Sequence, residues 1–350
     1  MKHLITGGSG FLGNLIMRQL ISDGEEVKVL DIWKDINHPK DVEFIKCDIR
    51  DREGLRNAMR DVDIVHHNVA LVPLTKSGKL FNDVNVNGSR IAAEEAKKAD
   101  VSAFIHMSSS AIYGAVDKFP ITENTKTTPI EIYGSAKLAG EEAVLSVLSK
   151  TDVSTIIIRP RTILGQGRLG IFQILFDWIN EGKNVYVIGS GNVKFQFIHA
   201  HDLMSAYMLL LKKGKSGKYN VGTDNFGTLR NAIENVITHA NSKSKVKSLP
   251  QNITITTLKF ADWLGISPLA PWHYLTYHKE FYFDITELKR IGWEPKYSND
   301  LMFSESYDWF IKNRHQSKLA FNSSPHRKPV KESILKNRNL IQIYIKQYPN

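Results

Sequence analysis

Tyr133 and Lys137 stand four residues apart in the segment YGSAK, within the longer stretch EIYGSAKLAGEEAVLSVL that begins at Glu131. In a helix this spacing places the phenol and the ammonium on one face, a single turn apart. A tyrosine has a pKa of about 10 and is a poor base at neutral pH unless its phenolate is stabilised. A cation one turn away stabilises it, so the pair predicts a general acid/base at Tyr133 tuned by Lys137. The same spacing is common on solvated helix faces, so the prediction depends on what surrounds the pair.

Serine hydroxyls precede the pair in MSSSAIYG, residues 107–114, where a predicted strand ends. Ligands of open α/β sheets bind at the carboxyl ends of the strands, so we expect these hydroxyls to lie beside the tyrosine. In that position a serine hydroxyl hydrogen-bonds a substrate oxygen. The serines, the phenol and the ammonium together indicate a catalytic site.

A glycine-rich turn, TGGSGFLG at residues 6–13, joins the predicted strand KHLIT to the predicted helix FLGNLIMRQLISDG. Glycine permits the sharp turn, a close approach to a pyrophosphate and tight packing of the helix on the strand, while the helix N-terminus faces the anion. The turn therefore predicts a dinucleotide site. Its predicted cofactor-binding residues are Gly7, Gly10, Phe11, Leu12 and Gly13.

Two acidic residues end the next predicted strands. Asp31 follows the glycine turn by some twenty residues, where a carboxylate accepts both hydrogen bonds from the adenosine ribose. A 2′-phosphate would meet its negative charge, so Asp31 favours NAD over NADP; the alternative is a helix cap or a surface acid. Asp48 is expected to accept from the adenine amino group, with Ile49 packed on the ring.

Strands and helices alternate along the first half of the chain, which predicts an α/β fold with a Rossmann-type, doubly wound parallel sheet. After about residue 165 the rhythm loosens, and KYNVG reads as a late strand. We expect two lobes of one interleaved unit and a smaller C-terminal substrate lobe. The predicted parts are an NAD-binding domain at 1–165, a mixed region at 166–315 that contributes to the sheet and the substrate lobe, and a basic tail at 316–350.

Composition narrows the protein class. The chain has 350 residues, of which 42% are apolar, enough for a large core. Cys47 is its single cysteine, and no targeting segment or long apolar run is apparent, so we expect a cytoplasmic protein. The formal charge is +10, but the segment from Lys312 to Asn350 contains nine lysines and arginines and one acidic residue, Glu332. The rest of the chain is therefore near neutral, which argues against nucleic acid as a partner.

The chain resembles the extended short-chain dehydrogenase/reductase family, and within it the NAD-dependent epimerase/dehydratase group. The resemblance covers roughly residues 1–310 through TGGSGFLG, Asp31, CDI, NVNGS, SSAIYG, YGSAK, RPRTILG, FIHAHDL and YNVG. It implies NAD as cofactor and a catalytic set of serine, tyrosine and lysine, in which counting back four residues from Tyr113 gives Ser109; Ser108 and Ser110 remain neighbours that a shifted turn could substitute. It further implies contacts of Tyr133, Lys137 and Asn85 with the cofactor, and the candidate substrate contacts are Ser110, Arg159, Arg168 and Lys194.

Two departures from the family pattern stand out. Where the family commonly has two small residues after the histidine that ends the fourth strand, this chain has His66-His67-Asn68-Val69, so we expect a bulkier and more polar wall beside the cofactor. Adjacent strand residues point to opposite faces, so we expect structural roles for His66 and His67 and no metal site. In GNVKFQFIH, Phe195 stands where nucleotide-sugar enzymes of the family often carry an arginine that clamps a diphosphate, with Lys194 beside it. This departure weakens the prediction of a diphosphate clamp.

The resemblance also bears on the reaction. Family dehydratases usually carry an Asp-Glu pair after the catalytic hydroxyl, whereas Ser110 and Ala111 follow Ser109 here. Epimerisation or net dehydrogenation remains, and we expect an NAD-dependent nucleotide-sugar epimerase with a small-molecule substrate. A 3β-hydroxysteroid-type dehydrogenase is the alternative, favoured by Phe195 and the aromatic segment SPLAPWHYLTYHKEFYFD. A non-catalytic NAD-binding protein stays open, although such a protein has no physical need for the complete catalytic set.

The tail has its own pattern. In a helix its apolar residues would lie near one face and its basic residues largely elsewhere, which is typical of a helix lying on an anionic membrane. The alternatives are packing on its own domain or on a second copy in a homodimer, and a flexible basic tail. The apolar residues are Val330, Ile334, Ile341, Ile345 and Tyr348, and the bases are Lys331, Lys336, Arg338 and Lys346.

Cofactor choice provides a test of Asp31. We expect Asp31→Ser combined with a nearby arginine to shift affinity from NAD towards NADP, because the 2′-phosphate loses a repelling neighbour and gains a partner. Titration of both cofactors against the wild-type and altered proteins measures the shift. Tighter binding of NADP than of NAD by the wild type would contradict this role of Asp31.

Overall fold

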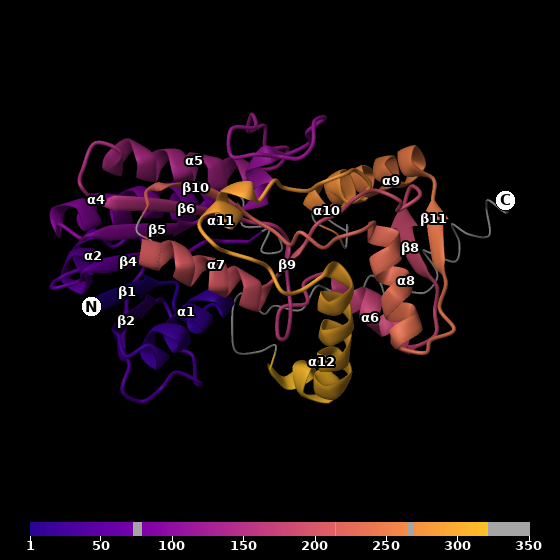
Figure 1. Ribbon diagram of the computed structural model, residues 1–350, viewed down its shortest axis with the longest axis horizontal. Helices are drawn as coiled ribbons and strands as arrows, with labels where there is room; N and C mark the ends of the chain where they lie inside the picture. Colours follow the sequence, from indigo (N-terminus) through magenta and orange to yellow (C-terminus); the bar gives the residue numbers. More distant parts are fainter. Residues whose placement is uncertain (73–78, 214, 265–268, 270, 321–350) are drawn as a thin grey trace.

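The computed structural model describes residues 1–72, 79–213, 215–264, 269 and 271–320. Seven parallel strands form its central sheet, with helices on both faces, which confirms the predicted Rossmann-type fold (Figure 1). The strands, in their order across the sheet, are β10 (Gly217–Val221), β6 (Ser154–Pro160), β5 (Ala103–Met107), β4 (Ile64–His67), β1 (Lys2–Thr6), β2 (Glu26–Asp31) and β3 (Glu43–Lys46).

The strand order reverses at β1: β2 and β3 lie on one side of it, and β4 and the later strands lie on the other. Strands β1 and β4 are parallel, hydrogen-bonded neighbours, with His3 opposite Ile64. A crevice opens at such a switch point outside the carboxyl ends of the strands. The glycine turn follows β1 at this edge and leads into α1 (Phe11–Ser22). The other helices of this half are α2 (Arg52–Ala58), α3 (Leu80–Asn82), α4 (Ser89–Lys98), α5 (Ile132–Leu148) and α7 (Ala200–Lys213), with a π-helical turn at Asp83–Gly88 and a 3-10 turn at Ser110–Tyr113.

The smaller lobe lies at the other end of the molecule and carries a two-stranded sheet of β8 (Val185–Ile188) and β11 (Val246–Leu249) (Figure 1). The short strands β7 (Ile163–Leu164) and β9 (Ile198–His199) pair separately. The remaining helices are α6 (Phe172–Asn180), α8 (Leu229–His239), α9 (Gln251–Trp263), α10 (Pro271–Thr276), α11 (Thr286–Arg290) and α12 (Asn299–Ala320). Helix α12 runs through the predicted boundary between residues 315 and 316, and the division into three parts stays a prediction.

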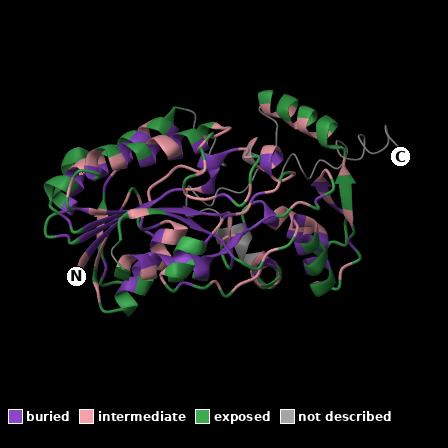
Figure 2. Ribbon diagram, turned by 45° about the horizontal axis from the view of Figure 1, so that its top comes forward, coloured by how far each residue is buried: buried purple, intermediate pink, exposed green. Residues whose placement is uncertain are grey.

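The sheet is buried on both faces, as its β-branched strands predicted (Figure 2). Alternate residues of one strand enter different cores: Ile156 and Ile158 of β6 pack on one side, whereas Ile157 packs on the other. The same alternation separates the two histidines of β4. His66 bonds Tyr207 of α7 at 2.6 Å, and His67 bonds Ser89 of α4 at 2.9 Å, so each has a structural partner on its own face.

A buried ion pair joins α5 to the sheet. Glu141 and Arg159 are at most 2% exposed, and Nη2 of the arginine lies 2.6 Å from Oε2 of the glutamate. The pair extends sideways, because Nη1 of Arg159 donates to the Tyr113 hydroxyl at 2.8 Å, which in turn donates to Asn220 of β10 at 2.8 Å. Helix α5, two strands and the 3-10 turn are thereby held in one arrangement.

Breaking this pair is expected to be costly. Glu141→Gln removes the anion and leaves the Arg159 guanidinium buried without a counter-charge, so the free energy of unfolding should fall by about 3–5 kcal/mol. Urea unfolding measures the loss. The double variant Glu141→Met, Arg159→Met is the control, because it removes both charges and should recover much of the stability; a single variant as stable as the wild type would contradict the importance of the pair.

The buried histidines predict a pH-dependent stability. Burial lowers the pKa of His67 to about 3 and that of His66 well below its usual value, so the folded chain keeps both neutral. Between about pH 6.5 and pH 3 the unfolded chain binds more protons, so the free energy of unfolding falls as the pH falls through this window. His67→Gln should flatten the dependence in urea unfolding series, while the exposed-site control His201→Gln should leave it steep. Equal slopes in wild type and His67→Gln would contradict the assignment.

Candidate active site

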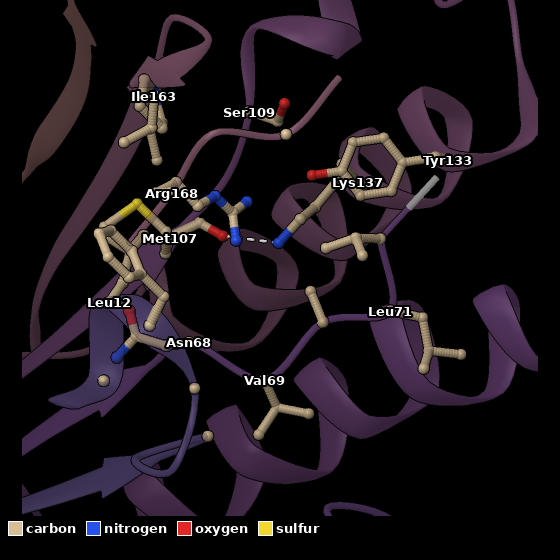
Figure 3. A pocket seen from close by; sticks show the side chains of 18 of the residues that line it. Leu12, Asn68, Val69, Leu71, Met107, Ser109, Tyr133, Lys137, Ile163 and Arg168 are labelled. Carbon is tan, nitrogen blue, oxygen red and sulfur yellow. Dashed lines mark hydrogen bonds between the residues drawn. The ribbon is translucent and has the colours of Figure 1, made fainter. Parts of the chain in front are cut away.

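A cavity of about 730 Å³ opens along the carboxyl ends of the sheet strands and extends to residues of α10 and α12. The structure brings most of the predicted site residues to its wall, several of which appear in Figure 3. The predicted residues that line it are Gly7, Gly10, Phe11, Leu12, Gly13, Asp31, Asp48, Ile49, Ser109, Ser110, Tyr133, Lys137 and Arg168.

The glycine turn forms one end of the cavity. Gly7 has a φ of +71°, and a Cβ there would lie 2.9 Å from the Val69 nitrogen. A Cβ on Gly13 would lie 2.3 Å from the Gly7 carbonyl oxygen, so helix α1 packs closely on the turn. Gly10 precedes α1 and gives it no side-chain cap, which leaves the first helical N–H groups for an anion. These features fit the pyrophosphate of a dinucleotide.

Two carboxylates line this same end. The Asp31 carboxylate accepts from the backbone nitrogens of Ser9 at 3.1 Å and Ile32 at 2.8 Å; burial raises its pKa, and these bonds partly offset the rise. Asp48 is paired through both oxygens with Arg50, at 2.9 and 2.6 Å, which lowers the pKa of Asp48. Both positions suit the adenosine half of a dinucleotide.

The phenol and the ammonium stand on α5, as their spacing predicted. The helix begins at Ile132, because the Glu131 carboxylate caps it by accepting from the backbone nitrogens of Tyr133 and Gly134. Tyr133 is half-buried, whereas Lys137 is buried and its Nζ donates to the Met107 carbonyl oxygen at 2.7 Å (Figure 3). Burial lowers the pKa of Lys137 to about 8, although the Glu141 charge raises it.

A second cation acts on the pKa of Tyr133. Burial raises this pKa, and the rise is opposed by the nearby Ser109 hydroxyl and by the charge of the Arg168 guanidinium. The Lys137 ammonium lies one helical turn away on the same helix and donates to the Met107 carbonyl oxygen. Arg168 is therefore a further cation at the phenol, beside the predicted Lys137.

The three serines have separate partners. Ser108 donates to the Glu141 carboxylate, so its hydroxyl is part of the buried ion-pair network. Ser110 accepts from Nη1 of Arg161 at 3.0 Å. Ser109 is the serine whose hydroxyl opposes the rise of the Tyr133 pKa, and it accepts from the Ala111 nitrogen at 3.2 Å as the cap of the 3-10 turn. The geometry therefore favours Ser109 as the hydroxyl that works with Tyr133.

Three of the predicted residues do not line the cavity. The Asn85 amide bonds the backbone of Leu71, accepting at 2.8 Å and donating at 3.1 Å, and so positions a lining residue. Arg159 is held by Glu141 beneath the cavity. Lys194 is exposed, with its ammonium 5.8 Å from the ring centre of Tyr282.

Two buried charged residues were not predicted from the sequence to support or line the site. Glu141 holds Arg159 and lies one turn after Lys137, a spacing that could have indicated it. Arg161 lines the cavity and follows the buried strand β6, where an arginine in an apolar run was the available signal. Further lining residues are Thr162 and Gln173, together with His273 and Tyr277 of the aromatic segment that the sequence offered as the wall of an apolar pocket.

The predicted amphipathic tail, Val330 to Tyr348, lies outside the described residues. Among the helices that the structure describes, none combines the length and apolar character needed to cross a bilayer.

Comparisons with known proteins agree with this geometry. The NAD dependent epimerase/dehydratase family matches residues 3–222. An uncharacterised protein of Sinorhizobium fredii is 42% identical over 95% of this chain and 84% of its own length. A second relative is the decarboxylating sterol-4-alpha-carboxylate 3-dehydrogenase of Mus musculus, which is 32% identical over 59% of this chain and 60% of its own length. The fold is similar to that of UDP-glucose 4-epimerase from Thermotoga maritima, with a TM-score of 0.74 at 23% identity over 90% of this chain and 100% of that one. The chain belongs to the NAD-dependent epimerase/dehydratase family, whose members are enzymes of the extended short-chain dehydrogenase/reductase type.

Proposed function

We propose that this chain is an NAD-dependent epimerase that inverts a secondary hydroxyl of a nucleotide sugar. The observation that carries the proposal is the convergence of Ser109, Tyr133 and Lys137 on one cavity that also contains the glycine turn. The structurally similar UDP-glucose 4-epimerase of Thermotoga maritima was solved with UDP-glucose, which supports this substrate class.

Each catalytic side chain has a role that follows from its position. Bound NAD supplies the hydride acceptor, in the cradle formed by the glycine turn and Asp31. The Tyr133 oxygen takes the proton of the substrate hydroxyl, and the Ser109 hydroxyl, which lies beside that phenol on the cavity wall, fixes the substrate oxygen. Lys137 and Arg168 hold positive charge beside the phenol and favour its ionised form.

The absence of a second acid favours epimerisation over dehydration. Loss of water requires a proton donor for the leaving hydroxyl. Among the described residues that line the cavity, the only carboxylates are Asp31 and Asp48, both at the adenosine end, and Ser110 and Ala111 follow Ser109. The reaction is therefore expected to invert one carbon of the substrate without loss of water and without net formation of NADH.

A hydrophobic alcohol is the second candidate substrate, in a 3β-hydroxysteroid-type dehydrogenation. Part of the cavity wall is apolar or aromatic, from Ile171, Phe172 and Tyr277, and Phe195 is fully buried where a clamp arginine was expected. The similarity to a sterol dehydrogenase points the same way. This reaction would release NADH, which separates it from epimerisation.

The phenolic oxygen of Tyr133 is the group to remove. Tyr133→Phe keeps the ring and should lower turnover by about two to four orders of magnitude, the usual contribution of a positioned proton carrier. Affinity for NAD should barely change. The measurement is turnover with UDP- and dTDP-sugars, with sugar interconversion and NADH absorbance followed in parallel.

The two readouts separate the candidates. Sugar-nucleotide interconversion without net NADH supports the epimerase, whereas steady NADH formation from a hydrophobic alcohol supports the dehydrogenase. Tyr186→Phe is a matched control, since it removes a phenolic oxygen of the small lobe that does not line the cavity. Near-normal turnover by Tyr133→Phe on the true substrate would exclude Tyr133 as the proton carrier.

A further inference from the structure

Arg161 follows β6 directly and brings a guanidinium group into the cavity wall with 1% of its surface exposed. Its Nε donates to the Gln196 carbonyl oxygen at 3.0 Å, and its Nη1 donates to the Ser110 hydroxyl at 3.0 Å. The third nitrogen, Nη2, is buried and has no hydrogen-bond partner within the described part of the chain. Leaving a charged donor unbonded in a protein interior is unfavourable, so Nη2 lacks an acceptor that something else must provide.

Arg159, at the end of β6, is a buried arginine whose guanidinium is paired with a carboxylate. It lies two residues earlier, is equally buried, and both its Nε and Nη2 reach the Glu141 carboxylate. Arg161 forms no ion pair with any residue that the structure describes. It is instead packed among aromatic rings, with its guanidinium carbon 4.1 Å from the ring centre of Phe281 and 4.8 Å from that of Phe195. These faces stabilise a cation but accept no ordinary hydrogen bond.

The charges around the cavity are unevenly distributed. Both lining carboxylates, Asp31 and Asp48, belong to the adenosine end. The opposite part of the wall contains Lys137, Arg161 and Arg168, and the described lining residues there include no carboxylate. A pocket lined by charge of one sign attracts a ligand group of the opposite sign. The substrate end of the cavity is therefore suited to an anion.

We propose that Arg161 binds a phosphoryl oxygen of the substrate, a nucleoside diphosphate derivative; this inference rests on the nucleotide-sugar substrate of the proposed function. Phe195 occupies the position where an arginine that clamps a diphosphate was expected. The Arg161 guanidinium packs over the Phe195 ring, so it places a positive charge next to that position. Nη2 is shielded in this structure, so contact with a phosphoryl group requires a neighbouring side chain to move. Tyr277 lines the cavity, and its ring centre lies 4.8 Å from that of Phe195, which packs on Arg161.

Binding of diphosphates to the NAD-loaded protein tests this role. The probes are UDP, dTDP and inorganic pyrophosphate, with uridine and thymidine as neutral counterparts, measured by titration calorimetry. Arg161→Met should weaken binding of the three anions about 10- to 100-fold, while nucleoside and NAD affinities stay unchanged. Lys194→Met is the matched control: it removes a nearby cation that lies outside the cavity, so the affinity for UDP should be retained.

Arg161→Lys keeps the proposal testable if Arg161→Met fails to fold. It retains the charge but loses the planar fork, so UDP should bind several-fold more weakly than to the wild type. Wild-type UDP affinity in a folded Arg161 variant, or no binding of any of the anions to the wild type, overturns the inference. If the wild type turns over sugar nucleotides but Arg161→Met binds UDP as tightly as the wild type, the role of Arg161 is wrong and the proposed function stands. If pyrophosphate binding depends on Arg161 but no sugar nucleotide is turned over, the proposed function is wrong and the anion site stands.

Discussion

The buried ion pair between Glu141 and Arg159 is the interaction on which the arrangement of the site depends. Each partner is close in sequence to a cavity residue, since Lys137 lies one helical turn before the glutamate and Arg161 lies two residues after the arginine. The Ser108 hydroxyl also donates to Glu141, which fixes the strand end that carries Ser109. Because the pair is held by several hydrogen bonds in a dry interior, it sets α5 and β6 at one mutual position.

The end of β4 supports the cofactor end of the cavity in a comparable way. The His67 ring bonds Thr6 on one side and Ser89 on the other, at 2.8 and 2.9 Å, and so connects the ends of two adjacent strands to α4. The chain after His67 then packs directly on the glycine turn, where a Cβ at Gly7 would meet Val69. The neutral His67 ring provides this support without placing a charge beside the glycine turn, since burial lowers its pKa to about 3.

The proposed function depends on how the charged residues are distributed around the cavity. The glycine turn and Asp31 line one end, where they suit a dinucleotide, and Lys137, Arg161 and Arg168 line the other part. Tyr133 also lines the cavity and is half-buried on the first turn of α5. In the proposed reaction the substrate hydroxyl would lie against this phenol, and positioning of this kind contributes much to the rate of enzymatic reactions.

The sequence alone determined the α/β fold, the glycine turn, the carboxylates Asp31 and Asp48, and the helix that carries Tyr133 and Lys137, because these features depend on local periodicity, glycine geometry and short spacings. It did not determine which side chains share an ion pair across distant elements. Arg159, Asn85 and Lys194 were predicted to contact ligands, yet they lie outside the cavity, while Arg161 lines it. Only tertiary packing decides such partners, since Glu141 and Arg159 come from different elements and meet when α5 packs on the sheet.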